Sequence, residues 1–197
     1  MTRYAIIGWG SLIWDPENIA PHVQGDWAMG GGPVLPMEFT RVSIKRNMAL
    51  AVCLDVVHGV GCITNAIASV RDEIGPVISD LARRERAPDH HIGAVCLASG
   101  HANGTSAAMV ADVRKWCQAR GWTGAVWTDL PSNFTEHLGQ EFNIPRAIAY
   151  LRGLTGDSLD QAVSYIEQAP AATDTPLRRV LNADDWWLAE ARRLNLR

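Results

Sequence analysis

Residues 4–14 read Tyr-Ala-Ile-Ile-Gly-Trp-Gly-Ser-Leu-Ile-Trp, an apolar run interrupted by two glycines. The apolar part, residues 4–8, predicts a first β-strand, and Gly8 and Gly10 predict a tight bend after it. In such a bend the peptide N–H groups of Gly10, Ser11 and Leu12 can converge on an anion. We therefore predict a carboxylate-binding loop here. The alternative is an ordinary glycine-rich turn with Trp9 and Trp14 as core aromatics.

Outward from this loop, the chain continues mostly as strands and then as helices. Further strands are expected over residues 37–44, 48–54, 60–70, 92–99 and 124–128. Helices are expected over residues 73–86 with Asp72 as cap, from Thr105 or Ser106 to Gly121, from Pro145, from Ser158 as a cap, and from Asn182. This order predicts an α+β fold, a small mixed or antiparallel β-barrel or curled sheet with flanking helices.

Length and composition restrict the classes of protein that this chain can represent. Its 197 residues are 47% hydrophobic, which suits one domain, with residues 140–197 as a helical extension packed on it. The net charge of −3 comes from mixed charges along the chain, so we expect no nucleic-acid or membrane partner. No segment approaches the roughly 20 apolar residues of a membrane span. The apolar start lacks a cleavage site, so we expect a cytoplasmic protein.

No metal site is expected from the cysteines and histidines. The cysteines lie singly within apolar runs, which predicts buried thiols; they are Cys53, Cys62, Cys96 and Cys117. His90 and His91 are adjacent, so in regular structure they point in different directions and cannot clamp one metal ion.

The glycine-rich segment resembles a known family signature. Residues 8–14, Gly-Trp-Gly-Ser-Leu-Ile-Trp, are similar to the Gly-Tyr-Gly-Ser-Leu-Ile-Trp that opens γ-glutamylcyclotransferases, in particular the ChaC-type enzymes that degrade glutathione. The resemblance implies that the loop binds the γ-glutamyl part of the substrate, largely through backbone groups. The residues implied are Gly8, Trp9, Gly10, Ser11 and Leu12. Trp9 replaces the tyrosine of the signature, so no role of a hydroxyl is carried over.

A second match implies a catalytic glutamate. Gly61-Cys62 begins a strand, and Leu81-Ala-Arg-Arg-Glu85 ends the helix that follows. This is similar to the ChaC-type arrangement, in which a strand beginning Gly-Cys-Val leads through a helix to an Arg-Glu pair. The resemblance makes Glu85 the catalytic residue.

Helical periodicity predicts where Glu85 points. The helix has an apolar stripe at Ile74, Val77, Ile78 and Leu81, and Glu85 falls on the same stripe. We expect the Glu85 carboxylate to face the interior without a close cation, because the neighbouring arginines, Arg84 included, lie off this face. The alternative is a glutamate that turns to water or pairs with an arginine from elsewhere.

Two further segments are candidates for substrate contact. Ser132 and Asn133 follow the last expected strand and are expected to hydrogen-bond the substrate, with a simple turn as the alternative. The segment Glu38–Ser43 stands where ChaC-type enzymes have Arg-Phe-Trp-x-Gly-Ser, and only Phe39 and Ser43 agree. Glu38 is a candidate second carboxylate, although an alternating strand would leave it solvated.

Together the motifs imply a lyase that needs no cofactor and no metal. Its substrate would be a small γ-glutamyl amine or peptide similar to glutathione. The enzyme would cyclise the glutamyl group and release 5-oxoproline. That chemistry requires the Glu85 carboxylate to lie within about 8 Å of the Gly10 to Leu12 amides, with Ser132 or Asn133 lining the same pocket. The alternative is a non-catalytic protein on the same fold that binds small carboxylates. A homodimer is left open.

Overall fold

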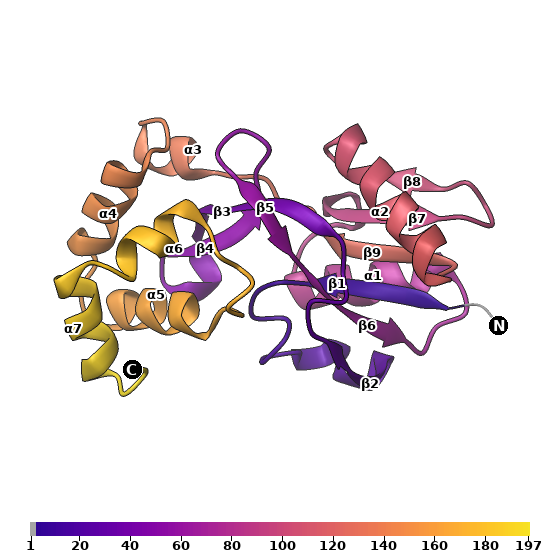
Figure 1. Ribbon diagram of the computed structural model, residues 1–197, viewed down its shortest axis with the longest axis horizontal. Helices are drawn as coiled ribbons and strands as arrows, with labels where there is room; N and C mark the ends of the chain where they lie inside the picture. The colour runs from indigo at the N-terminus through magenta and orange to yellow at the C-terminus, as the bar shows by residue number, and fades with distance from the viewer. Residues whose placement is uncertain (1–2) are drawn as a thin grey trace. The chain divides into compact units, whose positions relative to one another are not determined.

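The computed structural model describes residues 3–197. Backbone contacts divide the chain into two compact units, each assembled from two separate stretches of sequence (Figure 1). The first unit contains the residues up to 35 together with residues 63–130, and the second contains residues 36–62 and 131–197. The expected single domain with a helical extension over residues 140–197 stays a prediction.

The first unit is built around a mixed sheet of six strands in the order β2-β6-β1-β9-β7-β8. Its elements are β1 (Tyr4–Gly8), the 3-10 helix η1 (Glu17–His22), β2 (Val23–Ala28), β6 (Asn65–Ser69), α1 (Ile74–Glu85), the 3-10 helix η3 (Asp89–His91), β7 (Ile92–Cys96), β8 (Ala102–Asn103), α2 (Ala107–Arg120) and β9 (Gly124–Thr128). Strand β1 lies between β6, which is antiparallel to it, and β9, which is parallel.

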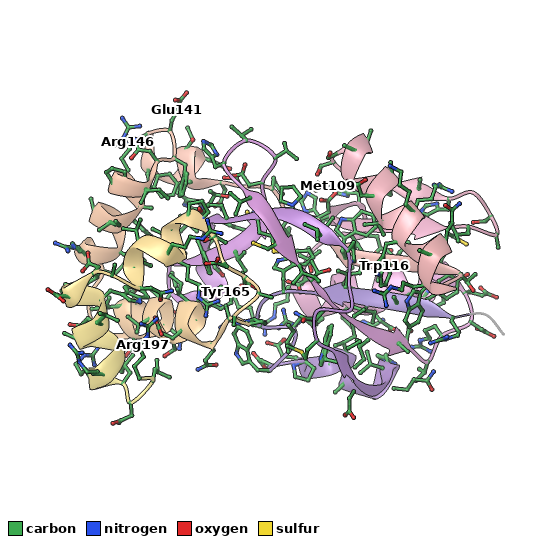
Figure 2. All side chains as sticks on the ribbon, in the orientation of Figure 1. Met109, Trp116, Glu141, Arg146, Tyr165 and Arg197 are labelled. Carbon is green, nitrogen blue, oxygen red and sulfur yellow. The ribbon has the colours of Figure 1, made fainter. Side chains whose placement is uncertain are left out.

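All residues of β1 are buried, so both faces of the strand are covered, which suits its uninterrupted apolar sequence. On one face Ile6 belongs to a core that includes Val77 and Leu81 of α1. Helix α2 contacts β7 and β9 and buries Met109 (Figure 2). Trp116 of α2, also labelled there, donates from Nε1 to the carbonyl of Gly31 at 3.0 Å.

A mixed α+β architecture is confirmed, but the closed barrel is not what the chain forms. Within residues 3–197 both sheets are open, with β2 and β8 at the edges of one and β4 and β5 at the edges of the other.

The strand expected over residues 60–70 is in fact β5 followed by β6. Thr64 interrupts it because its N–H and its hydroxyl both donate to the carbonyl of Pro33, at 3.1 and 2.6 Å.

The second unit is built around a sheet in the order β4-β3-β5. Its elements are β3 (Val34–Ser43), the 3-10 helix η2 (Ile44–Arg46), β4 (Ala49–Leu54), β5 (Val60–Ile63), α3 (Phe134–Leu138), α4 (Ile144–Gly153), α5 (Asp157–Gln168), α6 (Pro176–Leu181) and α7 (Asp185–Arg193). Helix α5 packs on β4, and α4 and α7 contact α6 and α5, respectively.

Some expected helix boundaries are wrong. Ser158, expected as a cap, lies inside α5, whose N-cap is Gly156. The helix expected from Asn182 begins later, at Asp185, because the Asp184 carboxylate caps α7 by accepting the Trp187 N–H at 3.2 Å. Helix α6, which ends at Leu181, was not predicted. Helix α1 has Glu73 at its N-cap instead of Asp72, and the Glu73 side chain makes no capping hydrogen bond.

The four cysteines are buried free thiols, as predicted; they are Cys53, Cys62, Cys96 and Cys117. Burial raises the pKa of the Cys117 thiol to about 12. Within residues 3–197, no helix combines the length and the apolar character needed to cross a bilayer.

Gly93 makes room for the largest side chain in the sheet core, and its replacement by alanine is expected to destabilise the protein. A Cβ at Gly93 would lie 2.0 Å from Cε2 of the fully buried Trp127. We expect Gly93→Ala to lower the free energy of unfolding by about 3 kcal/mol, measured by urea denaturation. Gly75→Ala is the control, because a Cβ at Gly75 meets nothing within 4 Å. It should change stability by less than about 1 kcal/mol, and equal losses in both variants would contradict the packing argument.

Candidate active site

The glycine loop, residues 8–12, presents buried peptide groups at the end of β1. All five of its residues are buried. The turn is closed by the N–H groups of Ile13 and Asp15, which donate to the carbonyls of Gly10 and Ser11 at 3.0 and 2.7 Å. Within residues 3–197, the N–H groups of Gly10, Ser11 and Leu12 donate no hydrogen bond. Because buried amides normally have an acceptor, these three are suited to receive one from a ligand.

Asn65 holds the start of the glycine loop in place. This residue is 1% exposed at the beginning of β6. The Asn65 Nδ2 donates to the Gly8 carbonyl at 3.1 Å, and Oδ1 accepts the Gly30 N–H at 2.9 Å. The sequence does not predict this role, because an asparagine between Thr64 and Ala66 carries no signal that distinguishes a buried hydrogen-bonding residue from a turn residue.

Removal of the Asn65 amide is expected to cost stability. Asn65→Ala leaves the Gly8 carbonyl and the Gly30 N–H without their partner in a buried place, which we expect to lower the free energy of unfolding by about 2–4 kcal/mol. Asn18→Ala, at an exposed position in η1, is the control and should stay within about 0.5 kcal/mol of wild type. Urea denaturation measures both. If Asn65→Ala lowered the free energy of unfolding no more than Asn18→Ala, the two hydrogen bonds of the Asn65 amide would contribute nothing to stability.

At the end of α1, both Arg84 and Glu85 are largely buried, although periodicity places only Glu85 on the apolar face. The Arg84 side chain is 4% exposed and the Glu85 side chain 14% exposed, so the residue expected off the apolar face is the more deeply buried. The expectation that Glu85 lacks a close cation is wrong, since Arg84 Nη1 donates to Glu85 Oε1 at 2.9 Å. Arg84 is buried because its long side chain carries the guanidinium to partners outside the helix as well.

Those outside partners belong to the segment that contains the glycine loop. Arg84 Nη2 donates to the Ser11 hydroxyl at 3.1 Å and to the Asp15 carbonyl at 2.7 Å. The Glu85 carboxylate and Ser11 therefore contact the same guanidinium group, although they are far apart in sequence. The structure thus brings Glu85 and the glycine loop together.

The side chains of Ser132 and Asn133 form hydrogen bonds with the sheet of the second unit. Ser132 Oγ donates to the Thr40 carbonyl at 2.9 Å. Asn133 Oδ1 accepts the Val42 N–H at 2.7 Å, and Asn133 Nδ2 donates to the Val42 carbonyl at 3.1 Å. Both residues thereby pair with the backbone of β3, and their predicted contact with a substrate stays a prediction.

Glu38 is buried, so the expectation of a solvated strand residue is wrong. Its side chain is fully buried in β3. Oε1 accepts the Phe39 N–H at 2.8 Å and Oε2 accepts the Leu177 N–H at 3.1 Å. Burial raises the pKa of Glu38, although these hydrogen bonds oppose the shift. Both carboxylate oxygens serve the fold of the second unit.

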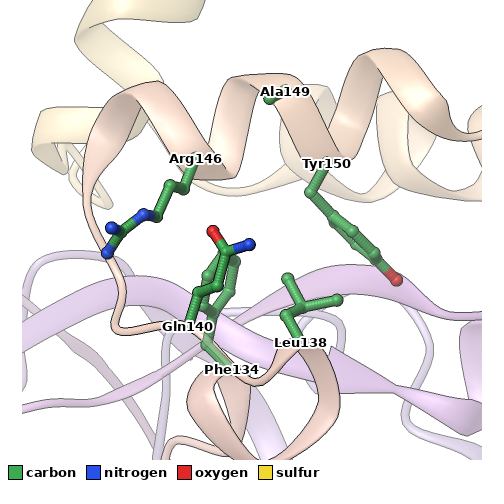
Figure 3. A pocket seen from close by; sticks show the side chains of 6 residues that line it. All are labelled: Phe134, Leu138, Gln140, Arg146, Ala149 and Tyr150. Atoms are coloured by element: carbon green, nitrogen blue, oxygen red, sulfur yellow. The ribbon is translucent and has the colours of Figure 1, made fainter.

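Two surface cavities are lined by residues other than Glu85 and those of the glycine loop. One, of about 240 Å³, belongs to the second unit and is lined by Phe134, Leu138, Gln140, Arg146, Ala149 and Tyr150 (Figure 3). The other, of about 340 Å³, belongs to the first unit and is lined by Gly75, Ile78, Ser79, Asp89, His90, His101 and Asn103. Neither lining includes Glu85 or a residue of the glycine loop.

Comparison of the chain with protein-family models, with curated proteins and with solved structures gave no match.

Proposed function

We propose that this protein is a γ-glutamylcyclotransferase-type enzyme that acts on a small γ-glutamyl amine or peptide and needs no cofactor. One observation carries the proposal: the Glu85 carboxylate and Ser11 contact a single guanidinium, beside buried amides of the glycine loop that have no acceptor within residues 3–197. A proton-transfer group and a set of N–H donors are the two parts that cyclisation of a glutamyl amide requires.

The proposed reaction begins with the α-amine of the glutamyl group. Glu85 removes a proton as the amine nitrogen attacks the γ-carbonyl carbon, which forms a five-membered ring. The amides of Gly10, Ser11 and Leu12 stabilise the negative charge that develops on the carbonyl oxygen. The protonated Glu85 then gives its proton to the leaving nitrogen as the C–N bond breaks, and 5-oxoproline and the free amine depart.

The site's main contribution would be to hold the substrate in a folded shape. The attacking nitrogen and the carbonyl carbon belong to the same molecule, so the rate depends chiefly on how closely the protein keeps them together. Backbone amides suit this task because they occupy fixed positions, whereas flexible side chains would have to be ordered for each turnover.

The test is release of 5-oxoproline from a panel of γ-glutamyl amines and peptides, glutathione included. Two matched controls separate cyclisation from other reactions. An N-acetylated γ-glutamyl amide lacks the attacking amine, and an α-linked glutamyl peptide cannot form the five-membered ring with the same bond cleavage. We expect product from members of the panel and none from either control.

Other outcomes of the assay have definite meanings. Glutamate released in place of 5-oxoproline, with the N-acetylated compound also cleaved, would indicate a hydrolase. Binding of γ-glutamyl compounds without any product would favour the non-catalytic carboxylate-binding protein. Two features motivate that alternative: the tryptophan at position 9 and the altered Glu38–Ser43 segment.

A further inference from the structure

Arg84 makes the contacts that relate Glu85 to the glycine loop. Its Nη1 donates to Glu85, and its Nη2 donates to Ser11 and to the Asp15 carbonyl. These nitrogens belong to one rigid, planar group, so the carboxylate and the loop cannot move independently while the bonds hold. We infer that Arg84 is a positioning residue that fixes the Glu85 carboxylate relative to the amides of the glycine loop. The inference rests on the proposed function.

The burial of Arg84 is poorly explained by a role in stability alone. Within residues 3–197, its Nε is buried and has no hydrogen-bond partner. A buried cation that is incompletely paired costs free energy, and an apolar side chain of similar length would fill the space at the helix end without that cost. The next residue along α1 offers a contrast, since the Arg83 side chain is 60% exposed. A requirement for fixed geometry accounts for the arginine at position 84.

The ion pair also assigns separate tasks to the two oxygens of Glu85. Oε1 accepts the bond from Arg84, which leaves Oε2 for the amine of the substrate. Without the guanidinium the Glu85 carboxylate would rotate about its side-chain bonds. A smaller fraction of its orientations would then place Oε2 within reach of the substrate amine. The predicted loss therefore falls on kcat, while KM, which depends on the loop amides, changes little.

The experiment measures kcat and KM for 5-oxoproline release in Arg84→Met and Arg84→Lys, each alone and combined with Glu85→Gln. We expect Arg84→Met to lower kcat about 100-fold with KM within about threefold of wild type. Arg84→Lys should lose about tenfold, because an ammonium cannot span Glu85 and Ser11 with the geometry of the planar fork. Arg83→Met is the matched control on the same helix and should keep wild-type kinetics.

The double variants separate positioning from general damage. If Arg84 acts through Glu85, Arg84→Met should lower the residual rate of Glu85→Gln by less than about threefold, whereas loss of folded protein would lower both rates equally. An equal loss in the two backgrounds overturns the inference, as does an Arg84→Met kcat within about threefold of wild type. Should Arg84→Met fail to fold, the same comparison with Arg84→Lys decides. A wild-type protein that releases no 5-oxoproline overturns the proposed function and this inference together.

Discussion

Glu85→Gln is expected to lower kcat for 5-oxoproline release by about 10³-fold or more, with KM close to that of wild type. Glutamine has nearly the same shape, and its amide oxygen can still accept the bond from Arg84 Nη1. What it cannot do is take a proton from the attacking amine and return it to the leaving nitrogen. The loss should therefore appear in the chemical step, measured by steady-state kinetics on the best substrate of the panel.

Controls for Glu85→Gln address both folding and charge. Glu73→Gln removes a carboxylate from the exposed N-cap of the same helix and should leave kcat unchanged. Circular dichroism and urea denaturation should show that Glu85→Gln remains folded. If Glu85→Gln turned over within about threefold of wild type, Glu85 would have no part in proton transfer.

The strands and helices that sequence predicted well are those whose pattern depends on local causes. Residues 4–8 form β1 as expected, because a run of apolar residues without alternation suits a strand covered on both faces. Helix α2 begins after the Ser106 cap and ends at Gly121, as predicted. Strand β2 was missed because its residues are mostly exposed at the edge of the sheet and lack alternation.

The candidate site was predictable only in part. The glycine loop and Glu85 are visible in the sequence as motifs, and the structure brings them together. Arg84 and Asn65 were not predicted as functional, because their importance comes from partners distant in sequence, Ser11 and Gly8 respectively. Periodicity classifies an arginine by its charge, whereas in the folded chain its length decides what it contacts.

The glycine loop offers a second large effect, in which backbone and side chain can be separated. Ser11→Ala removes one acceptor of Arg84 Nη2, but that nitrogen keeps its 2.7 Å bond to the Asp15 carbonyl. We therefore expect kcat/KM to fall by about tenfold or less, close to the net worth of one ordinary hydrogen bond, because the guanidinium stays paired. The peptide N–H of residue 11 is unchanged by this substitution, so binding through the backbone should survive.

Gly10→Val is expected to reduce kcat/KM below about 1% of wild type, far more than Ser11→Ala. Gly10 is buried, so the added isopropyl group has no solvent to enter and must either displace the loop or occupy the place of the substrate beside its amides. Direct binding of a γ-glutamyl ligand, measured by calorimetry on both variants, distinguishes the two parts of the loop: it should be lost in Gly10→Val and kept in Ser11→Ala. Equal and severe losses in both variants would mean that the Ser11 hydroxyl itself takes part in the reaction. The explanation that the glycine loop acts through its peptide N–H groups would then be wrong.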